Sequence, residues 1–135
     1  MTERVMWKET RPVIEAAMKV HSILGPGLLE ATYLACLEHE LRRRGLSARS
    51  QVPIPVRYDG MLLDIGYRVD LLVEESIVVE VKSVAKLIPI HEAQLLTYLR
   101  LSRYRIGLLI NFHTAHLRDG IRRMVNGWES QAIVR

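Results

Sequence analysis

Two charged side chains stand two residues apart in the apolar segment VVEVK, at residues 78–82. If this segment is a β-strand, Glu80 and Lys82 lie on the same face of a sheet. Ionised groups on a covered sheet face cost free energy unless they are paired or bound to something. The segment therefore indicates either a buried ion pair or a site for a bound ion or substrate.

A second carboxylate, Asp70, interrupts the preceding apolar segment GYRVDLLV, at residues 66–73. If the two segments are neighbouring strands, Asp70, Glu80 and Lys82 converge, and the two close carboxylates repel each other unless a cation neutralises them. A hard divalent ion such as Mg²⁺, with oxygen ligands and several retained waters, meets that need. The Lys82 ammonium could then hold a water or stabilise an anion in a metal-assisted hydrolysis. The alternative is a simple ion pair between Lys82 and one of the acids.

Three further polar side chains are expected on helices that cover this sheet. Glu30 extends the apolar stripe of the 28–44 segment back by four residues, which predicts an inward carboxylate in the first turn, where the helix dipole favours negative charge. Gln94 and Tyr98 are four residues apart and share one helix face. They either reach over the sheet to the lysine, a water or a phosphate, or form an ordinary boundary face with a partly buried Tyr. Spacing alone leaves both interpretations open.

These side chains must be positioned by the elements that the pattern predicts. Strands are expected at residues 52–56, 66–73, 77–83 and 105–112. Helices are expected from near Thr10, at Leu28–Arg44, at Pro89–Ser102 and at about 116–126. Pro12 would lie in the first turn of the first helix, and two prolines, Pro53 and Pro55, make the first strand an edge strand. The predicted fold is therefore α/β, in the order ααβββαβα, with a mixed four-stranded sheet flanked by helices.

Length and composition predict one domain spanning residues 1–135. Hydrophobic residues make up 49% and charged residues 25%, which is typical of a globular rather than a disordered chain. The apolar runs are too short to span a bilayer and the N-terminal residues lack the apolar segment of a signal peptide. Cys36 is the only cysteine, which excludes an internal disulfide. We therefore expect a cytoplasmic protein with no membrane partner, and the net charge of +4 weakly favours an anionic partner.

In order and spacing, five short motifs resemble those of the GxxExxY proteins, a branch of the PD-(D/E)XK nuclease superfamily. The motifs are GLLEATY (27–33), YRVDLLV (67–73), EVK (80–82), HEAQLLTYL (91–99) and GLLINF (107–112). The resemblance covers the chain from about Val13 to about Val125. It departs from the superfamily pattern at Val69, where a proline often precedes the first carboxylate.

The resemblance implies a restriction-endonuclease-like core and a site like that of RecB-like nucleases. Asp70 and Glu80 would bind Mg²⁺ or Mn²⁺, with Glu30 supplementing the metal site. Lys82 would lie beside the scissile phosphate. Gln94 and Tyr98 fit the Q-x-x-x-Y element, which positions the lysine or the nucleic-acid backbone.

Together these observations predict a metal-dependent phosphodiesterase that acts on nucleic acid, with DNA favoured over RNA. Three basic side chains, Arg68, Lys86 and Arg100, are candidates for holding the backbone without reading sequence. Little sequence specificity is expected because no second domain is available for groove readout. The alternative is a non-catalytic nucleic-acid- or partner-binding module that keeps the nuclease fold. A homodimer and a subunit of a larger assembly are both compatible with the sequence.

Overall fold

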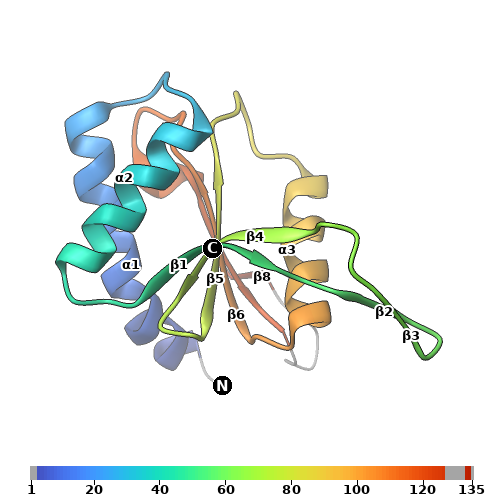
Figure 1. Cartoon of the computed structure of the whole chain (residues 1–135). Helices are drawn as coiled ribbons and strands as arrows, with labels where there is room; N and C mark the ends of the chain where they lie inside the picture. Colours follow the sequence, from blue (N-terminus) through green and yellow to red (C-terminus); the bar gives the residue numbers. More distant parts are fainter. Residues whose placement is uncertain (1–2, 127–132, 135) are drawn as a thin grey trace.

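The computed structural model describes residues 3–126 and 133–134, with side chains described from Lys8 to Asn126. Figure 1 shows three layers, with the sheet seen nearly edge-on between α1 and α2 on one side and α3 on the other. The helices are α1 (Glu3–Leu24), α2 (Glu30–Arg43) and α3 (Pro89–Ser102), and a 3₁₀ turn, η1, spans Leu117–Gly120. The strands are β1 (Ala48–Pro53), β2 (Val56–Tyr58), β3 (Met61–Leu63), β4 (Arg68–Val73), β5 (Ile77–Lys82), β6 (Ile106–Asn111), β7 (Ile121–Val125) and β8 (Ile133–Val134).

The main sheet has the strand order β1-β4-β5-β6-β7-β8. The β5–β6 pair is parallel and every other neighbouring pair is antiparallel. Helix α3 provides the crossover that a parallel pair requires, because its two strands run in the same direction. A mixed sheet covered by helices on both faces confirms the predicted α/β class and is consistent with a restriction-endonuclease-like fold.

Each face of the sheet carries its own apolar cluster. On the α1 and α2 face, the fully buried Tyr33 stacks on Phe112 with ring centroids 4.6 Å apart. The Tyr33 hydroxyl also donates to the Gly25 carbonyl and accepts the Leu28 N–H, which holds the turn before α2 in place. On the opposite face, α3 packs Leu95 and Leu99 against Gly107. A Cβ at Gly107 would lie 3.0 Å from the Leu99 side chain, so glycine allows α3 to lie close to the sheet.

Strands β2 and β3 form a separate hairpin that projects from the body as an arm (Figure 1). A tight turn closes its tip, where Asp59 and Gly60 both adopt positive φ, at 49° and 79°. Two consecutive residues with positive φ are typical of the tight turns that close two-residue hairpins. The arm therefore places a short strand pair outside the main sheet, on the side of α3.

The predicted helix at residues 116–126 is wrong, and so is the count of four strands. This segment forms the short η1 turn and then β7, which pairs with β6 and gives the main sheet six strands. Leu117, Ile121 and Val125 recur at a helical spacing, but Ile121 and Val125 also fit a strand, in which alternate residues share a face. The strand forms rather than the helix because β6 offers an unpaired edge, and pairing with that edge buries both residues.

The first helix begins earlier than predicted. Helix α1 already includes Glu3, so Pro12 lies inside it rather than in its first turn. Proline removes one backbone donor, but the helix continues because residues on one face of the following turns, such as Val13, Ala16 and Val20, are buried in the core. Of the helices described, none combines the length and the apolar character needed to cross a bilayer.

Candidate active site

The backbone pairing between β4 and β5 stops one residue before two carboxylates would face each other. The last pair in register is Leu71 with Val79, and the same register would bring Asp70 opposite Glu80. Instead, Asp70 Oδ2 accepts the Val81 N–H at 2.8 Å. The Asp70 side chain thus accepts a hydrogen bond from the β5 backbone, at the point where the pairing of the two strands ends.

Glu80 lies buried at this opening. Its side chain is 5% exposed, and Oε1 has no hydrogen-bond partner among the described residues. Burial, and then the neighbouring Asp70 carboxylate, raise the pKa of Glu80 from 4.5 to about 9. A buried carboxyl oxygen without a partner, beside a second carboxylate, fits a hard cation that takes oxygen ligands. The residues present therefore suit a divalent metal ion.

Lys82 is partly buried and, by strand alternation, lies on the same face as Glu80. Its positive charge lowers the pKa of Glu80, although less than burial and Asp70 raise it. Among the described carboxylates, none forms an ion pair with Lys82. The structure thus differs from the simple ion pair that was the alternative interpretation of this segment.

Helix α3 brings Gln94 and Tyr98 to the same place. Gln94 Nε2 donates to the Tyr98 hydroxyl at 3.1 Å. Burial raises the pKa of the Tyr98 hydroxyl, and the negative charges of Glu80 and Asp70 contribute to the increase. The charges of both carboxylates thus affect the Tyr98 hydroxyl, to which Gln94 donates a hydrogen bond.

Glu30 does not face inward as predicted. Its side chain is exposed because α2 begins at this residue, next to the end of β5, where little of the sheet remains to cover it. Glu30 Oε1 nevertheless accepts the Ser83 N–H at 3.3 Å, and Ser83 Oγ donates to the Leu28 carbonyl at 2.6 Å. Within the described residues, no group of three or more His, Cys, Asp or Glu side chains is arranged to hold a metal ion. Asp70 and Glu80 are thus brought together, and Glu30 is held one residue beyond Lys82.

Asn111, which the sequence interpretation did not single out, fixes the chain that leaves β5. Its side chain is buried at the end of β6, beside Lys82 in the strand register. Asn111 Nδ2 donates to the Val84 carbonyl at 2.9 Å, and Oδ1 accepts the Val84 N–H at 3.1 Å. The sequence signal that could have identified Asn111 was an amide side chain at the end of an apolar strand, because a buried polar group needs hydrogen-bond partners.

The three predicted backbone-binding residues come from three different segments, and no contact described gathers them into one group. Arg68 is exposed at the start of β4, two residues before Asp70. Lys86 is exposed in the segment between β5 and α3, and Arg100 is exposed on α3. Their positions are compatible with contacts to an extended polyanion.

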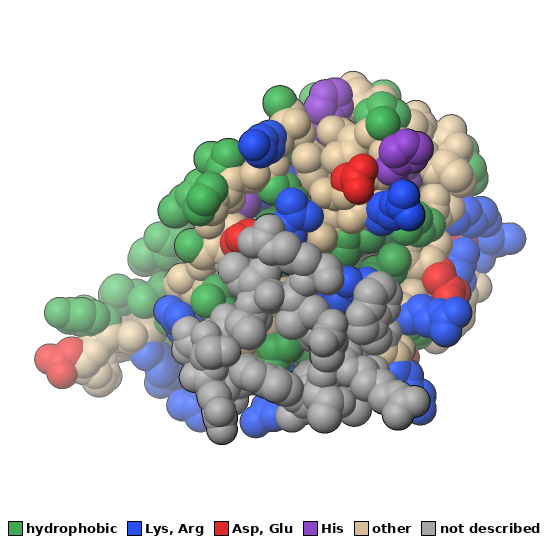
Figure 2. Space-filling view, turned by 180° about the vertical axis from the view of Figure 1, so that it is seen from behind, with side chains coloured by type: hydrophobic (Ala, Val, Ile, Leu, Met, Phe, Trp, Pro, Cys, Tyr) green, Lys and Arg blue, Asp and Glu red, His purple; other side chains and the backbone are tan. Residues whose placement is uncertain are grey.

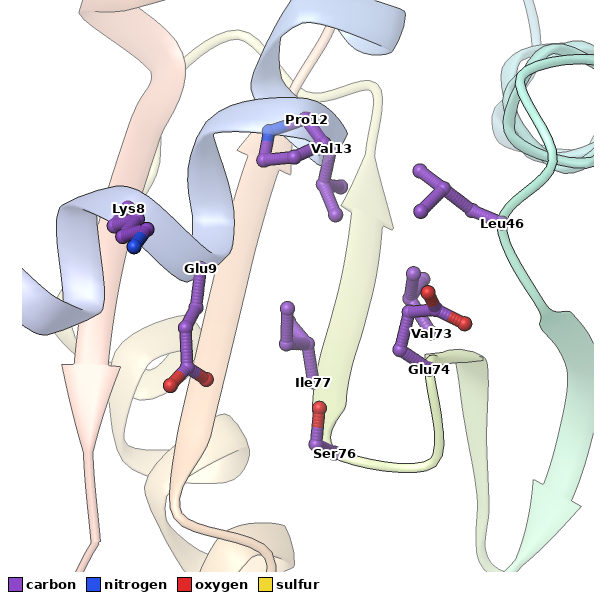
Figure 3. A pocket seen from close by; sticks show the side chains of 9 residues that line it. All are labelled: Lys8, Glu9, Pro12, Val13, Leu46, Val73, Glu74, Ser76 and Ile77. Carbon is purple, nitrogen blue, oxygen red and sulfur yellow. The ribbon is translucent and has the colours of Figure 1, made fainter.

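Two pockets lie at opposite ends of the β4–β5 pair. One, of about 720 Å³, lies between α3 and the residues just before β4, and Tyr67, Gln94 and Tyr98 are among its lining residues. The other, of about 490 Å³, lies at the turn between the strands, where Val13, Val73 and Ile77 form an apolar floor (Figure 3). Its two carboxylates, Glu9 and Glu74, come from α1 and from the turn, and Glu74 Oε2 already accepts the Ser47 N–H. Of these two pockets, the first is lined by Tyr98, whose pKa is affected by the charges of both carboxylates.

Comparison with known proteins gives one match. The model of a family described as the PD-(D/E)XK nuclease superfamily matches residues 7–124. This range contains Glu30, the paired carboxylates, Lys82 and the Gln94–Tyr98 pair. No curated protein and no solved structure matches the chain.

Proposed function

Because the chain belongs to the PD-(D/E)XK nuclease superfamily, we propose that it is a metal-dependent nuclease that hydrolyses nucleic acid, with DNA preferred to RNA. The observation that carries this proposal is the opening between β4 and β5. There Asp70 and the buried, partly unpartnered Glu80 lie together, with Lys82 on the same face. The two carboxyl groups and the ammonium are suited to phosphodiester hydrolysis with a divalent ion.

Asp70 and Glu80 would hold Mg²⁺ or Mn²⁺, which commonly bind through one or two carboxylates and keep several waters. When bound, such an ion supplies Lewis-acid stabilisation of the phosphate and makes nearby water more acidic. Glu80 must give up its proton first, because burial beside Asp70 raises its pKa to about 9. Binding of a cation by the two carboxyl groups would therefore require Glu80 to be ionised.

Lys82 supplies the positive charge that a phosphate requires as negative charge develops on its oxygens. Its ammonium has no described carboxylate partner, so its hydrogen bonds remain available for a phosphate or a water. Asn111 holds the segment after Lys82 through Val84, which fixes where β5 ends. Gln94 and Tyr98 are positioning residues that face the same opening from α3.

Contacts to the nucleic-acid backbone would come from Arg68, Lys86 and Arg100, which are exposed around the site. Contacts to phosphates carry no sequence information, so we expect little sequence specificity. The motif from Gly27 to Tyr33 supports assignment to the GxxExxY branch, since Tyr33 stabilises the turn that precedes Glu30. A cytoplasmic location, and assembly as a homodimer or within a larger complex, remain part of this proposal.

A cleavage assay tests the proposal. Single- and double-stranded DNA and RNA would be incubated with the protein in Mg²⁺, in Mn²⁺ and in EDTA. We expect cleavage only with metal, and a loss of about a thousandfold in Lys82→Ala, because one preorganised charge is removed from the transition state. Lys8→Ala, which changes an exposed lysine at the opposite pocket, is the matched control and should cleave normally. Cleavage that survives in Lys82→Ala would place the activity elsewhere, and binding without cleavage would support the non-catalytic alternative.

A further inference from the structure

The pocket that Gln94 and Tyr98 line is built from two elements that lie far apart in the sequence. Its walls come from the base of the β2–β3 arm and from α3, and its volume of about 720 Å³ is within the range of small-molecule sites, roughly 300–1,000 Å³. The lining residues are Val56, Ile65, Tyr67, Ile90, His91, Ala93, Gln94, Thr97, Tyr98 and Leu101. The lining includes no Asp, Glu, Lys or Arg.

The chemistry of the lining favours a flat and neutral ligand with polar edges. The Tyr67 and Tyr98 rings lie 6.2 Å apart at 52°, so two aromatic rings border the space. Ile65, Ile90 and Leu101 supply aliphatic contacts. Gln94 and Thr97 supply an amide and a hydroxyl, which can pair with hydrogen-bonding groups on a ring edge.

The pocket also lies near the proposed catalytic opening. Tyr67, which lines it, stands three residues before Asp70, and its ring lies 6.2 Å from that of Tyr98, to which Gln94 donates a hydrogen bond. A ligand that places one group in the pocket and a phosphate at the opening would therefore need only a short linker between the two groups. A nucleotide has this construction, with an aromatic base and a phosphate separated by one sugar.

We propose that this pocket binds an unpaired nucleobase, so that the preferred substrate is a single-stranded segment of nucleic acid. The inference rests on the proposed nuclease function, because it assumes a phosphate at the opening. A base within a duplex is stacked and paired, whereas an unpaired base can stack on aromatic side chains with little dependence on its identity. The pocket thus selects for strand form and not for sequence.

The arm contributes exposed apolar surface as well as a pocket wall. Ile65 is 62% exposed and Tyr67 is 44% exposed, at the base of the arm. Figure 2 shows hydrophobic side chains along the projecting arm, seen from behind. Apolar surface of this kind could also be covered by a second copy of the chain, and the test separates that occupant from a nucleobase.

The test measures binding without cleavage. Lys82→Ala is used as the background, and the fluorescence anisotropy of a labelled oligonucleotide gives Kd for a single strand and for a hairpin duplex of the same length. Adding Tyr67→Ala should weaken binding of the single strand roughly tenfold, as expected for the loss of one base-stacking ring, and leave duplex binding within about twofold. Tyr67→Phe keeps the ring and should bind normally. Tyr58→Ala removes a ring at the arm tip that is even more exposed, at 69%, and lies outside the lining, so it is the control.

A second variant guards against loss of the fold. Ile90→Ala changes a side chain that is 64% exposed, and it should weaken single-strand binding about threefold, again without changing duplex binding. An oligonucleotide with abasic sites should bind the parent protein as weakly as the intact strand binds the Tyr67→Ala variant. Equal effects on both strand forms, or no effect, would overturn the inference. A change of oligomeric state in Tyr67→Ala without a selective loss of single-strand binding would assign the pocket to a second copy.

The two proposals can fail separately. Cleavage in the parent protein, with single-strand binding that is insensitive to Tyr67, overturns the base pocket and keeps the nuclease. Ring-dependent single-strand binding in a protein that cleaves nothing keeps the pocket and overturns the nuclease.

Discussion

The two ends of the β4–β5 pair differ although the same two strands form both. From Leu71 to Val73 and from Ile77 to Val79 the strands are fully paired, and all six side chains are at most 3% exposed. At the other end the pairing stops, and Asp70 takes the Val81 N–H while Glu80 Oε1 stays without a partner among the described residues. One end is a paired, apolar part of the sheet, and the other brings charged groups together.

Two glutamates show the difference most directly. Glu74, at the paired end, is exposed and its Oε2 accepts the Ser47 N–H at 3.1 Å. Glu80, six residues later, is buried, and its pKa is raised to about 9. A buried polar atom without a partner costs about 1–3 kcal/mol, which the apolar packing of the paired end must offset. The buried carboxyl group at the opening therefore lowers the stability of the fold, as functional sites often do.

The largest expected effect separates the two ends by activity. Asp70→Asn should reduce metal-dependent cleavage about a thousandfold, or about 4 kcal/mol in transition-state free energy, because it removes one of two paired carboxylates. Glu74→Gln makes the same kind of change at the paired end and should cleave within twofold of the parent protein. The measurement is kcat/KM with excess Mg²⁺. Similar losses in both variants would mean that the opening has no special role.

The second effect separates the two ends by stability. Leu72 is fully buried at the paired end, so Leu72→Ala should lower the free energy of unfolding by about 3 kcal/mol through lost burial and an incompletely filled cavity. Urea unfolding followed by circular dichroism measures this loss. The folded fraction should retain normal cleavage, because Leu72 belongs to the apolar cluster under α3 and supplies no ligand or charge to the opening. A specific loss of activity in a folded protein would show that the two ends are coupled.

The third effect has the opposite sign, because Glu80 is expected to destabilise the metal-free protein. Its pKa is higher in the folded protein, at about 9, than the ordinary value of 4.5, so between these values the folded state holds a proton that the unfolded chain has released. The contribution of Glu80 to stability is therefore present at low pH and is lost as pH rises from about 4.5 to about 9.

Glu80→Gln removes this titration and tests its sign. In EDTA at pH 8.5 the variant should be more stable than the parent protein by several kcal/mol, and at pH 5 the two should be nearly equal. Mg²⁺ should stabilise the parent protein at pH 8.5 and not the variant. An equal stability difference at both pH values would contradict the raised pKa of Glu80.

The open end could be predicted from the sequence because its residues violate a strong local pattern. Asp70, Glu80 and Lys82 interrupt segments that are otherwise apolar, and such interruptions are visible without any knowledge of the fold. Gln94 and Tyr98 followed from helical spacing, which brought them to one face of α3. These residues were predictable because each depends on the periodicity of its own element.

The features that were missed depend on contacts between elements. The segment from Leu117 to Val125 fits a helix and a strand equally well, and only the edge of β6 selects the strand. The pocket needs the base of the arm to lie beside α3, which no local pattern specifies. The exposure of Glu30 depends on where β5 ends relative to α2, and one helical stripe cannot show that.

The smallest expected effect tests whether the Glu30 carboxylate contributes to cation binding at the open end. Its carboxylate is exposed and makes one long contact, Oε1 to the Ser83 N–H at 3.3 Å, so its influence on a cation at Asp70 and Glu80 is expected to be modest. Glu30→Gln keeps an acceptor for Ser83 but removes the charge. The Mg²⁺ concentration for half-maximal cleavage should rise about threefold to tenfold, because one nearby negative charge is lost, while kcat recovers at high Mg²⁺.

Ser83→Ala is the matched control for Glu30→Gln. It keeps the N–H that Glu30 accepts and removes only the Ser83 Oγ contact to the Leu28 carbonyl. If Glu30 acts through its charge, Ser83→Ala leaves the Mg²⁺ requirement unchanged. If Glu30 acts only by holding the end of β5, then Glu30→Gln cleaves normally at every Mg²⁺ concentration and Glu30→Ala loses kcat. That second result would assign Glu30 to the support of the opening and leave Asp70 and Glu80 as the two carboxylates that bind the cation.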